Sequence, residues 1–254
     1  MPDLEQSVLN SIDGKSKDLL PFIPYILQDL WEMGTDPKVI CKLIKENIKR
    51  DFYNILDLGC GKGAVSVKLA AELNCKITGI DGVPEFIKEA ETYAAKFNVN
   101  EKCRFTAGDI RNFSSSEKFD IVILGAIGQV FGNMFETLKK VTNFLQKDGF
   151  IIIDDGYISD DETEAGRQYL RKKGFFTQIE GAGFAVIKEE ISEFNCKVET
   201  DEIIFRNIEK RIGELKLKYP EKEHLFEEYL QAQIKENDTL ENLLTTGTWL
   251  LKRE

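Results

Sequence analysis

The stretch from Tyr53 to Gly63, YNILDLGCGKG, decides which fold this chain adopts. Its first part, Tyr53 to Leu58, is a short apolar run with one acidic residue near its end, which is typical of a buried strand. The glycines that follow permit a tight turn whose backbone a ligand can approach closely. From Lys62 to Leu73 apolar residues recur at helical spacing, so the sequence predicts a strand, a glycine-rich turn and a helix.

The same alternation of strands and helices continues along the chain. Further apolar runs predict strands at Lys76 to Ile80, Arg104 to Ala107, Phe119 to Leu124, Phe150 to Ile153, Phe184 to Ile191 and Thr246 to Leu251. Helical patterns from Pro84 to Phe97 and from Phe135 to Leu145 separate some of them. Because most of these strands are nearly all apolar, the pattern indicates an α/β protein whose parallel sheet is covered by helices on both faces.

Helical additions flank this alternating pattern. Leu19 to Ile48 is mostly helical in pattern, and its aromatic-rich stripe is expected to pack on the edge of the sheet. Thr200 to Glu236 is charged and helical, and Pro220 is expected to divide it into two helices. We therefore expect an N-terminal helical arm at residues 1–50, a core at 51–198, a helical insertion at 199–244 and the last core strand at 245–254.

Composition narrows the classes of protein to which the chain can belong. The 254 residues are 42% hydrophobic and 31% charged, as in ordinary globular proteins. The net charge of −10 opposes a broad electrostatic footprint for DNA or RNA. Neither an apolar run long enough to span a bilayer nor a signal-peptide pattern is found, so we expect a cytoplasmic protein without membrane contact. The five cysteines are scattered without a close pair, so neither a metal site nor a redox dithiol is expected.

Asp81 adds an acidic partner to the glycine turn. It ends the second predicted strand, where a carboxylate can accept hydrogen bonds from both hydroxyls of a ribose. The helix after the turn presents unpaired N–H groups to a carboxylate or phosphate. These features predict a nucleoside-containing ligand without selecting one, because Gly59, Gly61 and Ala64 also satisfy a loose dinucleotide fingerprint.

The stretch from Ile55 to Gly63, ILDLGCGKG, resembles the first motif of the class I S-adenosylmethionine-dependent methyltransferases. The resemblance continues, in the order of that family, through GIDGVPEFIKEAE (79–91), AGDIRNF (107–113), KFDIVILG (118–125) and LQKDGFIIIDD (145–155). It implies a Rossmann-like, seven-stranded, mostly parallel sheet with helices on both faces, and S-adenosylmethionine as the cofactor.

The resemblance also implies which residues contact the cofactor. The glycine loop would lie against the methionine part, Asp81 would hold the ribose hydroxyls, and Asp109 would accept a hydrogen bond from the adenine amino group. The full set of implied contacts is Asp57, Gly59, Cys60, Gly61, Gly63, Asp81, Gly82, Asp109, Ile110, Leu124 and Gly125.

Methyl transfer from a sulfonium is an in-line displacement, so the protein mainly aligns the two reactants and excludes water. A base is needed only when the acceptor arrives protonated. Asp154, Asp155 and Tyr157 follow the fifth strand and are candidate catalytic residues, although Asp155 and Gly156 could simply form a turn. His224 lies among charged residues, which favours a solvated helix surface.

Candidate residues for the acceptor pocket come from the helical additions and from one loop. Tyr25 and Trp31 of the arm could cap the pocket, or they could belong to the core. Gln129 lies in the stretch Ala126 to Phe131, which suits a pocket wall. The insertion at 199–244 is expected to be a lid over the acceptor site.

Several functions remain open at this point. A small-molecule methyltransferase, monomeric or homodimeric, fits the acidic chain best. A nucleic-acid methyltransferase is the nearest rival, but the tetrapeptide of the N-P-P-Y type that is common in amino-methylating enzymes is absent. A non-catalytic scaffold or sensor of the same fold and an NAD-dependent oxidoreductase are the alternatives from other classes.

Overall fold

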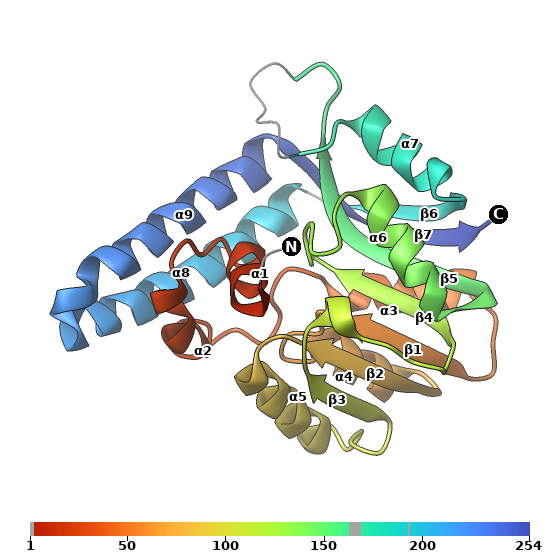
Figure 1. Cartoon of the computed structure of the whole chain (residues 1–254), viewed down its shortest axis with the longest axis horizontal. Coiled ribbons are helices and arrows are strands. Elements are labelled where there is room, and N and C mark those ends of the chain that lie inside the picture. The colour runs from red at the N-terminus through yellow and green to blue at the C-terminus, as the bar shows by residue number, and fades with distance from the viewer. Residues whose placement is uncertain (1–2, 163–168, 193) are drawn as a thin grey trace.

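The computed structural model describes residues 3–162, 169–192 and 194–254. A seven-stranded sheet in the order β3-β2-β1-β4-β5-β7-β6 forms its centre (Figure 1). Neighbouring strands from β3 to β5 are parallel, whereas β7 is antiparallel to both of its neighbours, β5 and β6. The strands are β1 (Tyr53–Leu58), β2 (Cys75–Asp81), β3 (Cys103–Ala107), β4 (Phe119–Gly125), β5 (Leu145–Ile158), β6 (Phe184–Ile191) and β7 (Leu244–Arg253). The predicted seven-stranded, mostly parallel sheet is therefore confirmed.

Helices cover both faces of the sheet. The helices α3 (Pro37–Asn47), α4 (Ala64–Glu72) and α5 (Pro84–Lys96) pack on one face, and α6 (Met134–Val141) and α7 (Lys172–Gly181) pack on the other. This arrangement follows from the strands themselves, because consecutive side chains alternate between the faces. In β5, for example, Ile152 belongs to the apolar cluster of the first face, and Ile151 and Ile153 belong to that of the second.

The arm and the insertion pack against each other beside the sheet. The arm contains α1 (Leu4–Ser11), the 3₁₀ turn η1 (Lys17–Phe22) and α2 (Ile23–Ile26), and the insertion is a hairpin of α8 (Phe194–Lys218), η4 (Pro220–Lys222) and α9 (Glu223–Asn242) (Figure 1). Phe22 lies edge-on to both Tyr219 and Phe226 in their shared apolar cluster. The aromatic stripe of the arm thus packs mainly on the hairpin, and the expectation that it packs on the sheet edge is wrong. The break at Pro220 is confirmed.

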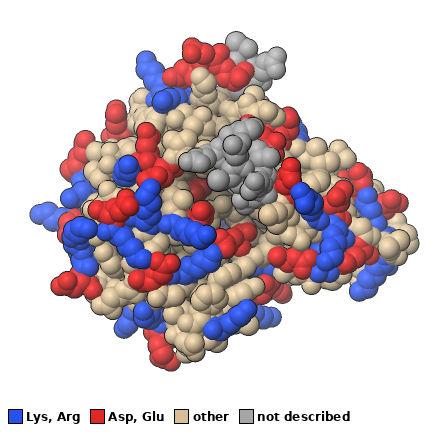
Figure 2. Space-filling model, turned by 180° about the vertical axis from the view of Figure 1, so that it is seen from behind, with Lys and Arg blue, Asp and Glu red and all other residues tan. Residues whose placement is uncertain are grey.

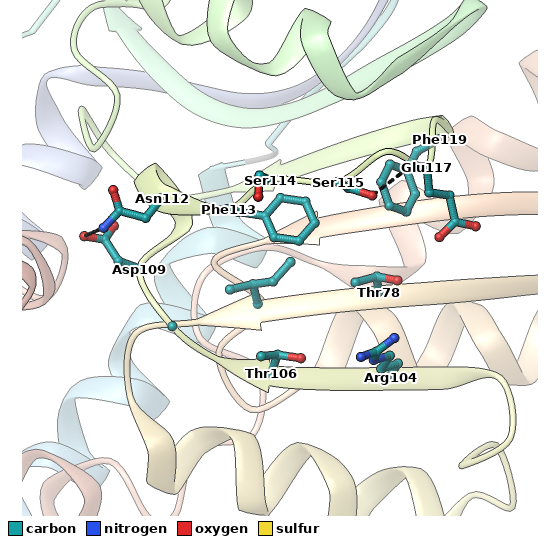
Figure 3. Close-up of a pocket in the computed structure, with 12 residues that line it drawn as sticks. Thr78, Arg104, Thr106, Asp109, Asn112, Phe113, Ser114, Ser115, Glu117 and Phe119 are labelled. Atoms are coloured by element: carbon teal, nitrogen blue, oxygen red, sulfur yellow. Dashed lines mark hydrogen bonds between the residues drawn. The ribbon is translucent and has the colours of Figure 1, made fainter.

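The connection between β3 and β4 lacks an α-helix and contains only the short turn η2 (Ile110–Asn112). As a result, a groove of about 480 Å³ runs along the exposed face of β2 and β3 (Figure 3). Thr78, Thr106 and Arg104 line the sheet side of this groove, and Asp109 lies at the end where the strands finish. Among the described residues, no helix has the length and apolarity that a membrane crossing requires.

Candidate cofactor and acceptor site

The glycine loop joins β1 to α4 at the carboxyl edge of the sheet. Gly59, Gly61 and Gly63 have φ values of +79°, +51° and +73°, a backbone conformation that residues with a side chain rarely adopt. The amides of Gly59 and Cys60 donate to the carbonyl of Ile80 at 2.8 and 3.0 Å, which fixes the loop to the end of β2. The loop therefore requires glycine for its shape and is held rigidly at the sheet.

Asp81, the last residue of β2, lies against this loop. Its carboxylate accepts hydrogen bonds from the amide of Gly61 at 2.8 Å and from the amide of Val83 at 2.9 Å. Burial raises the pKa of Asp81, although the hydrogen bonds from the backbone act in the opposite direction. The structure thus brings together the loop and the acidic residue that the sequence singles out.

Asp57 and Cys60 lie beneath the loop surface. Asp57 is buried, accepts a hydrogen bond from the hydroxyl of Ser66 at 2.6 Å, and has a pKa that burial raises to about 6. Cys60 is also buried, which raises the pKa of its thiol well above its ordinary value. Asp57 therefore links the end of β1 to α4, and the buried side chains of both residues lie beneath the loop surface.

Asp109 and Ile110 follow β3 at the same edge. Arg111 donates to the carboxylate of Asp109 from Nη2 at 2.7 Å and from Nε at 2.9 Å, and this contact lowers the pKa of Asp109. Asp109 also caps η2 by accepting from the amide of Arg111, while Ile110 is buried. A ligand amino group at Asp109 would therefore share this carboxylate with a guanidinium.

Apolar side chains lie directly on the glycine surface. A Cβ built on Gly59 would lie 2.5 Å from Cγ2 of Ile127, and one built on Gly61 would lie 2.9 Å from Cε of Met33. At Gly82 the equivalent contact is with Val8 of α1, at 2.8 Å. A ligand that reaches the glycine backbone must displace these flexible side chains, and it then gains an apolar cover.

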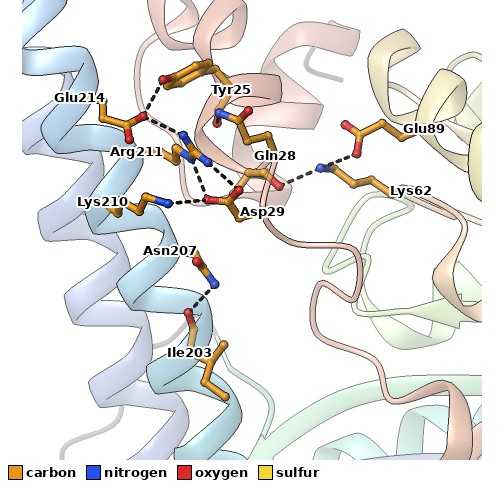
Figure 4. Close-up of polar contacts among 11 residues, drawn as sticks. Tyr25, Gln28, Asp29, Lys62, Glu89, Ile203, Asn207, Lys210, Arg211 and Glu214 are labelled. Atoms are coloured by element: carbon orange, nitrogen blue, oxygen red, sulfur yellow. Dashed lines mark hydrogen bonds and ion pairs between the residues drawn. The ribbon is translucent and has the colours of Figure 1, made fainter.

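Lys62 ties the N-terminal arm to the glycine loop, and nothing in the sequence pattern singled it out. Its side chain is completely buried. Its ammonium donates to the carbonyl of Leu27 at 2.8 Å and pairs with Glu89 of α5 at 2.9 Å (Figure 4). Its own carbonyl accepts from the indole N–H of Trp31 at 3.0 Å. Both ends of this one residue therefore hold the arm in place.

The three candidate pocket residues have contacts on different elements. Tyr25 donates to Glu214 of α8 at 2.6 Å, and the Arg211 guanidinium lies over its ring (Figure 4). Trp31 stacks on Tyr93 of α5 with 4.2 Å between the ring centroids. Gln129 is exposed in the loop between β4 and α6. The structure does not gather these three side chains around one cavity.

The candidate catalytic residues of β5 face different sides of the sheet. Asp154 accepts a hydrogen bond from the Thr248 hydroxyl at 2.9 Å, whereas Tyr157 is buried among Phe175, Phe176 and Trp249 in the cluster of the opposite face. Asp155 is an exposed residue, and its carboxylate accepts from the amide of Gly156 at 2.7 Å. Only Asp154 faces the side on which α3 packs. His224 is exposed on α9.

Thr35 lies in the loop that precedes α3, and nothing in the sequence pattern points to it. It is only 7% exposed, and its Oγ1 has no hydrogen-bond partner among the described residues, which costs about 1–3 kcal/mol. The hydroxyl faces Gly125 at the end of β4, since a Cβ built there would lie 2.7 Å from Oγ1. Leu124, the preceding residue, is buried. The part of the chain that the structure describes contains no cluster of metal-ligating side chains.

A glycine loop, an acidic residue at the end of β2 and a further one after β3 are thus arranged along one sheet edge. Residues 49–197 match the family model described as a methyltransferase domain. The chain belongs to the class I S-adenosylmethionine-dependent methyltransferases. This match covers more than half of the chain and includes every strand except β7.

Curated relatives of this methyltransferase differ in their named functions. The chain is 31% identical over 99 residues to the ubiquinone biosynthesis O-methyltransferase of Rickettsia akari, covering 39% of this chain and 38% of the relative. It is 32% identical over 104 residues to the trans-aconitate 2-methyltransferase of Streptomyces avermitilis, covering 40% and 38%. The ribosomal protein L11 methyltransferase of Thermosipho africanus is 31% identical over 118 residues, with 46% and 42% covered. The chain thus spans about two fifths of the length of these relatives.

Solved structures share the fold over almost the whole chain. A methyltransferase from Geobacter sulfurreducens in complex with S-adenosylhomocysteine has a TM-score of 0.77 at 17% identity, with 92% of this chain and 98% of that chain covered. YjhP from E. coli also has a TM-score of 0.77, at 18% identity, with 93% and 100% covered. At this identity the likeness establishes the fold of the methyltransferase.

Replacing Asp154 with asparagine is expected to stabilise the methyltransferase at high pH. Burial raises the pKa of Asp154 to about 7, with Asp155 and Asp36 adding repulsion. Between about pH 4 and pH 7, Asp154 is therefore protonated in the folded protein and ionised in the unfolded chain. The free energy of unfolding consequently falls as pH rises through this window. An amide removes this dependence and still accepts from Thr248. In urea unfolding, the free energy of unfolding of Asp154→Asn should exceed that of the wild type by about 2 kcal/mol at pH 8 and by a smaller amount at pH 5. Equal differences at both pH values would contradict the assignment.

Proposed function

We propose that this methyltransferase transfers the methyl group of S-adenosylmethionine to a small-molecule acceptor by direct in-line displacement. The observation that carries the proposal is the rigid Gly59–Gly63 loop with the Asp81 carboxylate packed against it. Ligands of open α/β sheets bind at the carboxyl ends of the strands, which is where these residues lie.

Residues along this edge suit each part of the cofactor. The backbone of Gly59 and Gly61 allows close approach of the methionine part, and Asp81 has the chemistry to accept from two ribose hydroxyls. We expect the adenine to lie beside Asp109 and the Ile110 backbone, which follow the end of β3. Met33 and Ile127 would move from the glycines and pack over the bound cofactor.

An acceptor of low molecular mass is favoured by the charge of the chain. The net charge is −10, and on the face seen in Figure 2 basic side chains alternate with acidic ones. Such a surface gives the phosphates of a nucleic acid little attraction. The relatives named for ubiquinone biosynthesis and trans-aconitate agree with this choice, whereas the relative named for ribosomal protein L11 points to a protein. A cytoplasmic location and a monomeric or homodimeric state stay predictions.

Labelled methyl transfer tests the proposal. The protein is incubated with S-adenosylmethionine that carries a labelled methyl group and, separately, with the dialysable, RNA and protein fractions of a cell extract. Label should accumulate in the dialysable fraction with the wild-type protein and stay at background with Asp81→Ala. Label that enters only RNA or only protein would refute a small-molecule acceptor.

A further inference from the structure

Two carboxylates, those of Asp154 and Asp36, lie at the carboxyl end of β5 without a cation. Asp154 follows the apolar part of the strand and faces the side on which α3 packs, and Asp36 is the N-cap of α3, where its carboxylate accepts from the amide of Lys38 at 2.8 Å. Asp36 lies close enough to raise the pKa of Asp154 by charge repulsion. In the described ranges, no Lys or Arg forms an ion pair with either carboxylate, whereas Asp29 and Glu32 of the arm are both paired. No basic side chain of the described residues therefore neutralises the charge at this edge.

An unpaired hydroxyl lies at the same edge. Thr35 is the neighbour of Asp36 and is more than nine-tenths buried. Its Oγ1 faces Gly125 and forms no hydrogen bond within the part of the chain that the structure describes. Gly125 is directly paired with Asp154 in the register of β4 and β5. Ala126 is exposed next to this pair, so solvent reaches the edge there. An unsatisfied buried hydroxyl beside uncompensated carboxylates is the arrangement that a bound N–H group would complete.

The carboxylate of Asp154 has hydrogen-bonding capacity left. Its Oδ2 accepts from the Thr248 hydroxyl, whereas no hydrogen bond within the described part of the chain involves Oδ1. Thr248 is buried and fixes the orientation of the carboxylate. Asp154 can therefore present one oxygen to a ligand without losing its support in the fold.

We propose that Thr35, Asp154 and Asp36 form the subsite for the reacting group of an amine, so that the acceptor atom is nitrogen. This inference rests on the proposed function, because it uses Gly125, one of the cofactor contacts that the resemblance to the family implies. A carboxylate-bearing acceptor would be repelled by these carboxylates, whereas an ammonium is attracted to them.

The reaction at this subsite balances without a further reagent. Asp154 takes a proton from the incoming ammonium, which exposes the lone pair of nitrogen. The lone pair attacks the methyl carbon, a carbon–nitrogen bond forms, and the carbon–sulfur bond breaks with its electron pair remaining on sulfur. A group that titrates near pH 7 suits this proton transfer, whereas it is too weak a base for an alcohol.

Acceptor screening with defined probes tests the proposal. Ethylamine, benzylamine, phenethylamine and spermidine are compared with ethanol, benzyl alcohol, phenethyl alcohol and phenylacetate, and the formation of S-adenosylhomocysteine is measured. At least one amine should give saturable turnover above the rate without acceptor, and no alcohol or carboxylate should exceed it. Turnover with none of the amines, or preference for an alcohol or carboxylate, would overturn the assignment.

Variants of the subsite make the test specific. With the best amine, Asp154→Asn should lower kcat/KM at least about tenfold, as the loss of a charge-assisted hydrogen bond does, and Thr35→Val should lower it about fivefold. Thr35→Ser keeps the hydroxyl and should stay near wild type, as should the charge-matched control Asp51→Asn, at an exposed position before β1. Wild-type kinetics in both Asp154→Asn and Thr35→Val would refute the subsite.

Cofactor affinity distinguishes failure of the amine subsite from failure of the proposed function. S-adenosylhomocysteine is titrated into the wild type and each variant by calorimetry, and all should bind it within about threefold of one another. If the wild type binds S-adenosylhomocysteine but uses no amine, the amine subsite fails and the proposed function stands. If the wild type binds no S-adenosylhomocysteine, the proposed function itself fails.

Discussion

Replacing Asp81 with alanine lowers the affinity for S-adenosylhomocysteine by about a hundredfold. Two hydrogen bonds from ribose hydroxyls to a carboxylate contribute about 3 kcal/mol together, which corresponds to this factor. The same substitution frees the amides of Gly61 and Val83, so the loop also loses one of its contacts with the end of β2. Calorimetric titration of the wild type and the variant measures the change directly.

Two further variants show which of these contributions is lost. Asp81→Asn keeps an acceptor oxygen and should lose less affinity than Asp81→Ala, because a neutral acceptor makes weaker hydrogen bonds. Asp51→Asn removes one negative charge at an exposed position and should leave the affinity unchanged. A dissociation constant for Asp81→Ala within about threefold of the wild type would exclude Asp81 from the cofactor site.

Replacing Lys62 with alanine is expected to destabilise the fold by about 3 kcal/mol. The substitution leaves the Leu27 carbonyl and the Glu89 carboxylate without their partner and opens a cavity under the loop. For a chain of this length such a loss lowers Tm by about 6–12 °C. Thermal and urea unfolding, followed by circular dichroism, measure both quantities.

Lys68→Ala is the matched control for this prediction. Lys68, like Lys62, forms an ion pair with a glutamate. Its partner is Glu32 of the arm, and both side chains of this pair are partly exposed. Exposed ion pairs contribute little, so the control should lose less than about 1 kcal/mol. If Lys62→Ala were no more destabilising than Lys68→Ala, the buried lysine would not hold the arm to the glycine loop.

The sheet could be predicted because each strand is recognisable from a short run of consecutive residues. Apolar runs such as Phe119 to Leu124, and the glycines whose positive φ the turn requires, carry the pattern in consecutive residues. The strand from Phe184 to Ile191 has the bounds that the alternation predicts. By contrast, β5 extends well beyond Phe150 to Ile153, because its later residues pair with β7 far along the chain.

The contacts of the arm were beyond prediction for a physical reason. Lysine is rarely fully buried, so the burial of Lys62 is not expected from its residue type. Its ammonium donates to a backbone carbonyl, which any residue at position 27 would supply. Thr35 lies in a loop whose position depends on this packing. Asp154 and Tyr157, however, face opposite sides of the sheet because side chains alternate along a strand with a period of two residues, and the sequence already contained that information.

A crystal structure of the methyltransferase with S-adenosylhomocysteine would show where the cofactor binds. We expect the ribose hydroxyls to bind Asp81, the adenine to lie beside Asp109 and Ile110, and Met33 and Ile127 to leave the glycine surface and pack on the ligand. A ligand bound away from the Gly59–Gly63 loop, with Ile127 still in contact with Gly59, would contradict it.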